Sequence, residues 1–287
     1  MTRRSNTICF WNSAHDSPHA YVLDGDILFG PAGHKQATGH SCQGQDPLEA
    51  AKRMWNGWEV DYCERDAGNY YPRMFRDGYR TPVVVPMSDD EETAFAASTE
   101  QEYLLEADLS SIARVVTPSP TNLGAYGSQI RNLLILACTE VEAQWKGILR
   151  TNGYAQQVLT TKDYVKLLGP LRLDAYSLRM FRYRDNAEIS PFANWDATNP
   201  TQSLPWYAAY NAAKHDREIS ASQATLAHAI SAVAAVCTLL AAQYGNRYVR
   251  PAERPFFGIT RLPHWHARER TYSPAKFSDW KCIQYAF

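Results

Sequence analysis

Residues 122–151 read NLGAYGSQIRNLLILACTEVEAQWKGILRT, and this stretch decides the fold of the second half of the chain. Its large apolar residues recur every three to four positions, which is the spacing of one buried helical stripe. Asn152 and Gly153 follow as a helix stop. The pattern therefore predicts a long helix over 122–151. Its stripe consists of Ile130, Leu133, Leu134, Ala137, Val141, Trp145 and Ile148.

Three further helices are predicted C-terminal to this one, over 161–168, 204–218 and 221–244. The last is rich in alanine, and small residues let helices approach closely. We therefore expect an antiparallel helical bundle with the alanine-rich helix at its centre. Its stretch 224–242 has almost no charge and is long enough to span a membrane. Because alanine dominates it and His228 interrupts it, we expect a buried bundle helix and no membrane.

The first 120 residues contain short runs with the composition of β-strands. Asp24 and Gly25 supply a hairpin turn between two of them. Asp46 before Pro47 is typical of a helix start, so a helix is predicted over 47–57. The predicted strands are Thr7–Trp11, His19–Leu23, Asp26–Phe29 and Thr81–Val85.

Two prolines in the segment Thr117–Thr121 exclude a helix there and mark a domain boundary near residue 120. Just before it, residues 89–98 suggest a helix, and 103–116 fit either an edge strand or a weak helix. The aromatic tail should pack back on the bundle or on the first domain. The predicted parts are a small α+β domain of unknown role over 1–120, an all-α bundle over 121–250 and the tail over 251–287.

The charge of the chain is split at the same boundary. Residues 1–120 hold 10 Lys and Arg against 18 Asp and Glu, whereas residues 121–287 hold 19 against 12. A basic half points to a polyanion such as nucleic acid, because Lys and Arg neutralise phosphates. The alternative is that the acidic part docks on the basic part of the same chain or of a second copy.

The six cysteines lie without CxxC spacing in a chain too long to need disulfide staples, so we expect them reduced. Two of them, Cys138 and Cys237, fall in apolar helical runs, where cysteine behaves as a small buried hydrophobe. The first residues contain no apolar segment of the signal-peptide kind. These features predict a cytoplasmic protein.

Residues 205–217 read PWYAAYNAAKHDR and gather polar and basic groups at one end of a predicted helix. Helical spacing places Asn211, Lys214 and Arg217 on one face, with His215 about a third of a turn away. A histidine with nearby cations is what metal-independent RNA cleavage by the 2′-hydroxyl requires. The alternative is that the cations complement the helix C-terminus, while Tyr210 and Asn211 bond within the bundle.

Together, the helix over 122–151, the tract 206–217 and the alanine-rich helix resemble the HEPN superfamily of prokaryotic all-α domains. Its members include metal-independent ribonucleases of toxin–antitoxin, abortive-infection and CRISPR systems, often with the signature R-N-x-x-x-H. Tyr210-Asn211-Ala212-Ala213-Lys214-His215 matches the Asn and the His but has Tyr in place of Arg. The resemblance implies a HEPN-like bundle, a homodimer and a possible antitoxin or defence-system partner.

If the site is active, the resemblance assigns acid–base catalysis to His215, charge stabilisation to Lys214 and Arg217, and orientation to Asn211. Tyrosine cannot supply the permanent cation of the usual Arg, so the second hypothesis is a non-catalytic module that binds a nucleotide or a partner protein. We expect no cofactor in either case. The neighbouring rings Trp206, Tyr207 and Tyr210 are predicted to contact the ligand.

Two tracts that interleave basic and aromatic residues support RNA as the partner, since cations follow phosphates and rings stack on unpaired bases. The alternative is that the rings are core and the arginines extend over them. In the first tract, Arg179 and Arg182 are predicted to bind. Its further members are Arg172, Tyr176, Phe181, Tyr183 and Arg184; the second tract contains Arg247, Arg250, Arg254, Phe256, Arg261, Trp265, Arg268, Arg270 and Tyr272.

Metal binding is not predicted. His34, His40 and Cys42 lie close in sequence, and His264 and His266 are two apart, but no spacing matches a zinc module.

Overall fold

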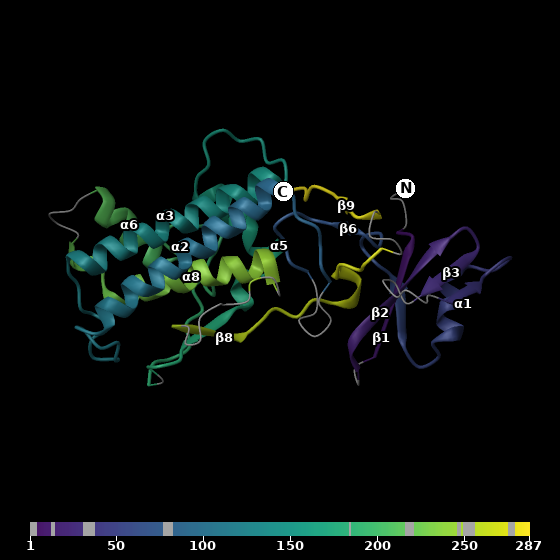
Figure 1. Ribbon diagram of the computed structural model, residues 1–287, viewed down its shortest axis with the longest axis horizontal. Helices are drawn as coiled ribbons and strands as arrows, with labels where there is room; N and C mark the ends of the chain where they lie inside the picture. Colours follow the sequence, from purple (N-terminus) through teal and green to yellow (C-terminus); the bar gives the residue numbers. More distant parts are fainter. Residues whose placement is uncertain are drawn as a thin grey trace. The chain divides into compact units, whose positions relative to one another are not determined.

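The computed structural model describes residues 5–12, 15–30, 38–76, 83–183, 185–215, 221–245, 248, 256–274 and 279–287; of residues 15–17 and 215 it describes the backbone only. The chain divides into two compact units (Figure 1). The sheet unit comprises residues 1–72, 76–87 and 264–284. The helical unit comprises residues 73–75, 88–263 and 285–287.

The sheet unit is built on five strands in the order β4–β3–β2–β1–β5, each antiparallel to its neighbours. Gly25 has φ 59 in the tight turn between β2 and β3, a left-handed value that glycine adopts at little cost. The strands are β1 (Thr7–Asn12), β2 (His15–Asp24), β3 (Ile27–Gly30), β4 (Thr38–Ser41) and β5 (Glu59–Tyr62). The first three predicted strands are confirmed. Of the fourth, residues 83–85 form no strand and 81–82 lie outside the described residues.

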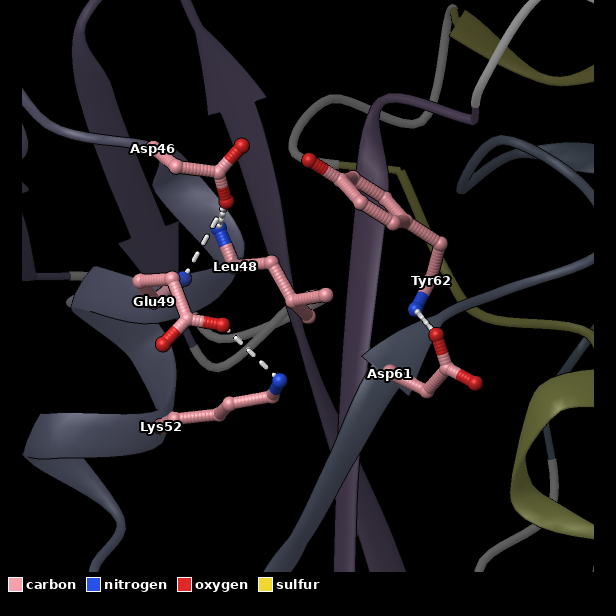
Figure 2. Close-up of polar contacts among 6 residues, drawn as sticks. All are labelled: Asp46, Leu48, Glu49, Lys52, Asp61 and Tyr62. Carbon is pink, nitrogen blue, oxygen red and sulfur yellow. Dashed lines mark hydrogen bonds and ion pairs between the residues drawn. The ribbon is translucent and has the colours of Figure 1, made fainter.

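Helix α1 (Pro47–Met54) begins where the sequence predicts. The carboxylate of Asp46 accepts hydrogen bonds from the backbone N–H groups of Leu48 and Glu49, at 2.9 and 3.2 Å (Figure 2). Pro47 at the first helical position has no N–H group. The Asp46 cap therefore serves the next two backbone N–H groups, which have no acceptor within the helix. Glu49 and Lys52 pair at 2.9 Å on the exposed side, and this bond raises the pKa of Lys52.

Apolar residues pack on both faces of the sheet. On one face, Phe10 stacks on Trp55 with ring centroids 4.2 Å apart, next to the buried Tyr21. The opposite face carries Cys9 and Cys63, covered by Ala267 from the C-terminal segment. The segment also supplies η5 (Ala267–Glu269) and β9 (Lys281–Cys282), which pairs in parallel with β6 (Asn69–Tyr70). The prediction of an N-terminal region that mixes strands and helix is confirmed.

The described residues of the helical unit form four helices of more than two turns: α2 (Asp89–Ala113), α3 (Ser128–Thr151), α6 (Pro205–His215) and α8 (Leu226–Tyr244). Three of the four helices predicted after residue 121 are thereby confirmed, with later starts for α3 and α8, whereas the one predicted over 161–168 is broken into short helical turns. Residues 216–218, predicted to continue α6, lie outside the described residues. The shorter segments are α4 (Thr161–Tyr164), η1 (Val165–Leu167), α5 (Leu168–Leu171), η2 (Leu173–Ala175) and η3 (Ala221–Gln223).

Helix α2 corrects the predicted boundary near residue 120, because it belongs to the helical unit. Ser88 starts it with a reciprocal capping box to Glu91. Leu105 and Leu109 are buried, and the helix packs against α3 and α8. The division therefore falls between residues 87 and 88, and 103–113 is helix and not strand. The prolines that suggested a boundary only separate α2 from α3.

Helix α8 is the core of the helical unit. An 18-residue window has mean hydropathy 1.7, and 83% of that window is buried inside the structure. Length and composition alone would allow a membrane span, but this burial is what the central helix of a soluble bundle shows. Both Cys138 and Cys237 are fully buried, as predicted, and all six cysteines are free.

The helical unit also contains a two-stranded antiparallel sheet, so the prediction of an all-α second part is wrong in this detail. Strand β7 (Ser177–Met180) pairs with β8 (Phe257–Arg261). Apolar and polar residues alternate in the sequence of 176–180, which suits a strand, although in β7 only Arg179 is exposed and Ser177, Leu178 and Met180 are buried. The predicted tail is not one element either: 256–263 and 285–287 join the helical unit, and 264–284 joins the sheet unit.

Candidate nucleic-acid interface

The first half of α6 packs inside the helical unit, which corrects the ligand-contacting role predicted for Tyr207 and Tyr210 but not the one predicted for Trp206. Trp206, Tyr207 and Tyr210 are only 3%, 4% and 2% exposed. The Trp206 Nε1–H donates to the Pro191 carbonyl at 2.9 Å. An aromatic ring at every turn is buried here because α6 packs on both α3 and α8. Tyr207 and Tyr210 are therefore core residues, whereas Trp206 forms part of a pocket wall.

A polar network fixes α6 on α3. The Tyr207 hydroxyl donates to Glu142 Oε1 at 2.8 Å, and Lys146 Nζ donates to Glu142 Oε2 at 3.3 Å. Glu142 and Lys146 lie four residues apart on α3, so the second contact is an ion pair within one helix. Burial and the bond to Glu142 raise the pKa of Tyr207, and burial with the nearby Glu142 raises the pKa of Tyr164 to about 12. Both hydroxyls are therefore protonated at neutral pH, and neither can act as a base there.

The C-terminal end of α6 carries the residues for which catalysis is predicted. Lys214 is exposed, and its Nζ donates to the Tyr210 hydroxyl at 3.0 Å. This bond raises the pKa of Lys214, so the amine is a cation at neutral pH. Asn211 is half-buried. The structure thus brings Lys214 to the Tyr that replaces the expected Arg, while the His215 side chain and all of Arg217 lie outside the described residues.

The clearest basic and aromatic surface lies on the β7–β8 sheet, apart from the α6 motif in sequence. Arg179 and Arg182 are exposed, and Phe181 between them is 49% exposed. Arg179 lies directly opposite Gly258 in the strand register, so the two share the outer face. A Cβ atom built on Gly258 would lie 2.1 Å from Cζ of Phe181. The ring of Phe181 therefore lies over the glycine, with its remaining surface open to solvent.

Three rings of the two predicted tracts are buried. Tyr176 is fully buried, and Phe256 and Trp265 are 6% and 3% exposed, so these rings are core. The structure describes three arginines of the second tract, and of these Arg261 alone belongs to the helical unit. Arg268 and the buried Arg270 belong to the sheet unit, whereas Arg184, Arg247, Arg250 and Arg254 lie outside the described residues.

A pocket of about 320 Å³ lies in the helical unit, between the starts of α6 and α8 and the segment that follows β7. Its wall includes Trp206, His228 and Asn186. Glu188 at this pocket pairs with Arg179 at 3.5 Å, so the pocket and the β7–β8 face share an ion pair. The sequence gives no periodic or motif signal for this pocket, because its wall comes from several separate segments.

A second cluster combines acid and thiol groups inside the helical unit. Ligand atoms of Glu102, Glu106 and Cys237 lie within 4.8 Å of one another, and the Cys237 thiol donates to Glu102 Oε1 at 3.3 Å. Glu106 Oε2 accepts from the Phe256 N–H at 3.2 Å. All three residues make further contacts, so a metal ion would have to displace existing partners.

Comparisons with protein-family models, with curated proteins and with solved structures found no match. The chain is therefore described by its own geometry. It combines a helical unit, whose small β7–β8 sheet has an exposed basic and aromatic face, with an antiparallel sheet unit.

Proposed function

We propose that the chain is a HEPN-like protein that binds single-stranded RNA, and that the β7–β8 face of the helical unit contacts the strand. One observation carries the proposal: the ring of Phe181 lies on Gly258, which is opposite the exposed Arg179 in the strand register, and the next residue in the chain is the exposed Arg182. A large exposed ring on a sheet, with cations beside it, is the arrangement that stacks on a base and pairs with its phosphates.

An unpaired strand fits this face better than a duplex. Bases in a duplex stack on each other and leave no ring face free, whereas an unpaired base offers its whole face to Phe181. Arginine is suited to the adjoining phosphates because its planar fork donates two parallel hydrogen bonds. The choice of RNA over DNA comes from the HEPN resemblance of the α6 motif.

The enzymatic form of this proposal is metal-independent endoribonuclease activity at the end of α6. Lys214, held at Tyr210 and positively charged, supports it, because the site then has a cation beside the position of the missing Arg. His215 would transfer the protons, with Arg217 and Asn211 assisting. The absence of disulfides among the six cysteines favours the cytoplasm. The resemblance implies a homodimer in a prokaryotic defence or toxin–antitoxin system, with a possible antitoxin partner.

Binding of a short fluorescent single-stranded RNA to the full chain tests the proposal. Base–aromatic stacking contributes about 1–3 kcal/mol, so Phe181→Ala should weaken binding by about 5- to 150-fold. Tyr103→Ala is the matched control, because Tyr103 is likewise a large exposed ring, at 60%, but belongs to α2 and to neither β7 nor β8. Equal losses in the two variants, or none in either, would reject the β7–β8 face as the binding surface.

A further inference from the structure

A short stretch of chain extends the β7–β8 sheet on the side of β7 away from β8. Leu178 and Ile189 form an antiparallel bridge and exchange two backbone hydrogen bonds, each 2.8 Å long. In an antiparallel register the next opposed pair is Arg179 and Glu188. Leu178 is buried, whereas Arg179 and Glu188 are exposed and in contact. Glu188 therefore lies on the same face of the sheet as Arg179 and Phe181.

Three different chemical groups thus form a row across this face. The ring of Phe181 lies over Gly258, Arg179 is opposite Gly258, and Glu188 is on the other side of Arg179. Neighbouring strands lie about 4.8 Å apart, so the backbone of Glu188 is roughly 10 Å from that of Gly258. A purine stacked on the ring and one hydrogen bond of about 3 Å together span such a distance. Glu188 is therefore placed at the edge of a stacked base.

The carboxylate of Glu188 is accessible to a ligand. Its Oε1 lies 3.5 Å from Nη2 of Arg179, whereas N–H···O hydrogen bonds measure about 2.7–3.2 Å. The side chains of Arg179 and Glu188 are 47% and 43% exposed, and an ion pair so open to water contributes little stability. A carboxylate also repels the phosphates of a bound strand. This acid therefore weakens RNA binding unless it accepts hydrogen bonds from a base.

Guanine is the base whose donors match a carboxylate. An ionised carboxylate can only accept, and its two oxygens can take two parallel hydrogen bonds. Guanine presents two adjacent donors, N1–H and N2–H, on its Watson–Crick edge, where proteins read unpaired bases. Adenine and cytosine present one amino group beside a ring nitrogen that accepts, and uracil presents one N–H between two carbonyls. Each of these three bases therefore turns an acceptor toward the carboxylate.

We propose that the β7–β8 face selects guanine in single-stranded RNA: the base stacks on Phe181 and donates its N1–H and N2–H to the Glu188 carboxylate. The selection rests on the proposed function, because Phe181 and the arginines must first hold the strand. Arg179, between the ring and the carboxylate, offsets the repulsion between Glu188 and the phosphates. Glu188 is then the residue that determines specificity.

Fluorescence anisotropy of the full chain with short labelled strands tests the choice of base. Each strand is an oligouridylate with one central guanosine, inosine, adenosine or cytidine. The guanosine strand should bind about 5- to 150-fold more tightly than the adenosine and cytidine strands, which is the discrimination of a bidentate contact. Inosine lacks only the N2 amino group of guanosine, so its strand should have intermediate affinity. If the adenosine, cytidine or inosine strand binds as tightly as the guanosine strand, guanine is not selected.

Glu188→Gln tests the residue. Glutamine has the same shape but offers one acceptor and one donor, so it cannot accept both guanine bonds. The preference for guanosine over adenosine should fall to within about twofold, while the adenosine strand binds at least as tightly as before because a negative charge is removed. Asp185→Asn is the matched control, since it removes the same charge from an exposed acid of the same segment.

Three results would overturn the role of Glu188. The first is a preference for guanosine that survives in Glu188→Gln, and the second is one that falls equally in Asp185→Asn. The third is an equal loss of affinity for every strand in Glu188→Gln, which is expected if Glu188 only positions Arg179.

Two further measurements separate this selection from the proposed function and from a free nucleotide. Phe181→Ala should weaken all four strands alike; if it weakens none, the face does not bind RNA and both proposals fail. If it weakens all four while Glu188→Gln keeps the preference for guanosine, only the selection of guanine fails. Guanosine 5′-monophosphate has a single phosphate, so it should displace the guanosine strand at least about tenfold less well than unlabelled strand does. Equal displacement would overturn the assignment to a strand.

Discussion

Replacing Gly258 by alanine should disable the RNA-binding face without removing any of its side chains. The added Cβ would lie 2.1 Å from Cζ of Phe181, whereas carbon atoms in contact keep about 3.5–4 Å. The ring must therefore move by more than about 1 Å and turn out of its place on the sheet. Losing the stack costs about 1–3 kcal/mol, so the affinity for single-stranded RNA should fall about 5- to 150-fold.

Folding should survive this substitution, because alanine is favoured over glycine in a strand by about 0.5–1 kcal/mol. Fluorescence anisotropy gives the affinity, and thermal unfolding checks the fold. Gly124→Ala is the control, since nothing lies within 4 Å of the Cβ position at Gly124. If Gly258→Ala binds RNA within about twofold of the control, the ring of Phe181 is not the stacking surface.

Three more outcomes follow from the helical unit. Tyr207→Phe removes the bond to Glu142 and should lower the free energy of unfolding by about 1.5–3 kcal/mol in urea; an unchanged midpoint would show that the network does not hold α6. Burial raises the pKa of Glu140. The folded state therefore keeps this proton to higher pH than the unfolded chain, and wild-type stability falls as pH rises above the ordinary glutamate range. Glu140→Gln should lack this decline, so its stability relative to wild type should increase from pH ~4.5 upward; a constant difference would argue against the shift. Finally, His215→Ala should abolish cleavage of RNA by metal-free protein, while RNA binding persists; unchanged cleavage would remove His215 from the site.

The helices could be predicted from the sequence because their signals are local. The stripe through α3, the cap at Asp46 and the small residues of α8 each depend on neighbours a few positions apart. The boundary between the units could not be predicted in this way. Helix α2 joins α3 and α8 through side chains such as Leu109, and no local pattern says on which unit a helix packs.

The candidate site was predictable in residue type but not in arrangement. Arg179 and Arg182 were named from their tract, and both are exposed. The position of Phe181 on Gly258 depends on the register between strands some 80 residues apart in sequence. Burial of Tyr207 and Tyr210 likewise depends on how α6 is rotated in the bundle, since a helical wheel shows which residues share a face but not which face is buried.

Photochemical crosslinking shows directly whether single-stranded RNA lies on the β7–β8 face. Single-stranded RNA is irradiated with the full-length wild-type protein, and the attached peptide is identified by mass spectrometry. If RNA lies on the β7–β8 face, attachment falls within 177–183, centred on Phe181, and is lost in Gly258→Ala. Attachment confined to the sheet unit, or equally strong attachment in wild type and Gly258→Ala, would contradict it.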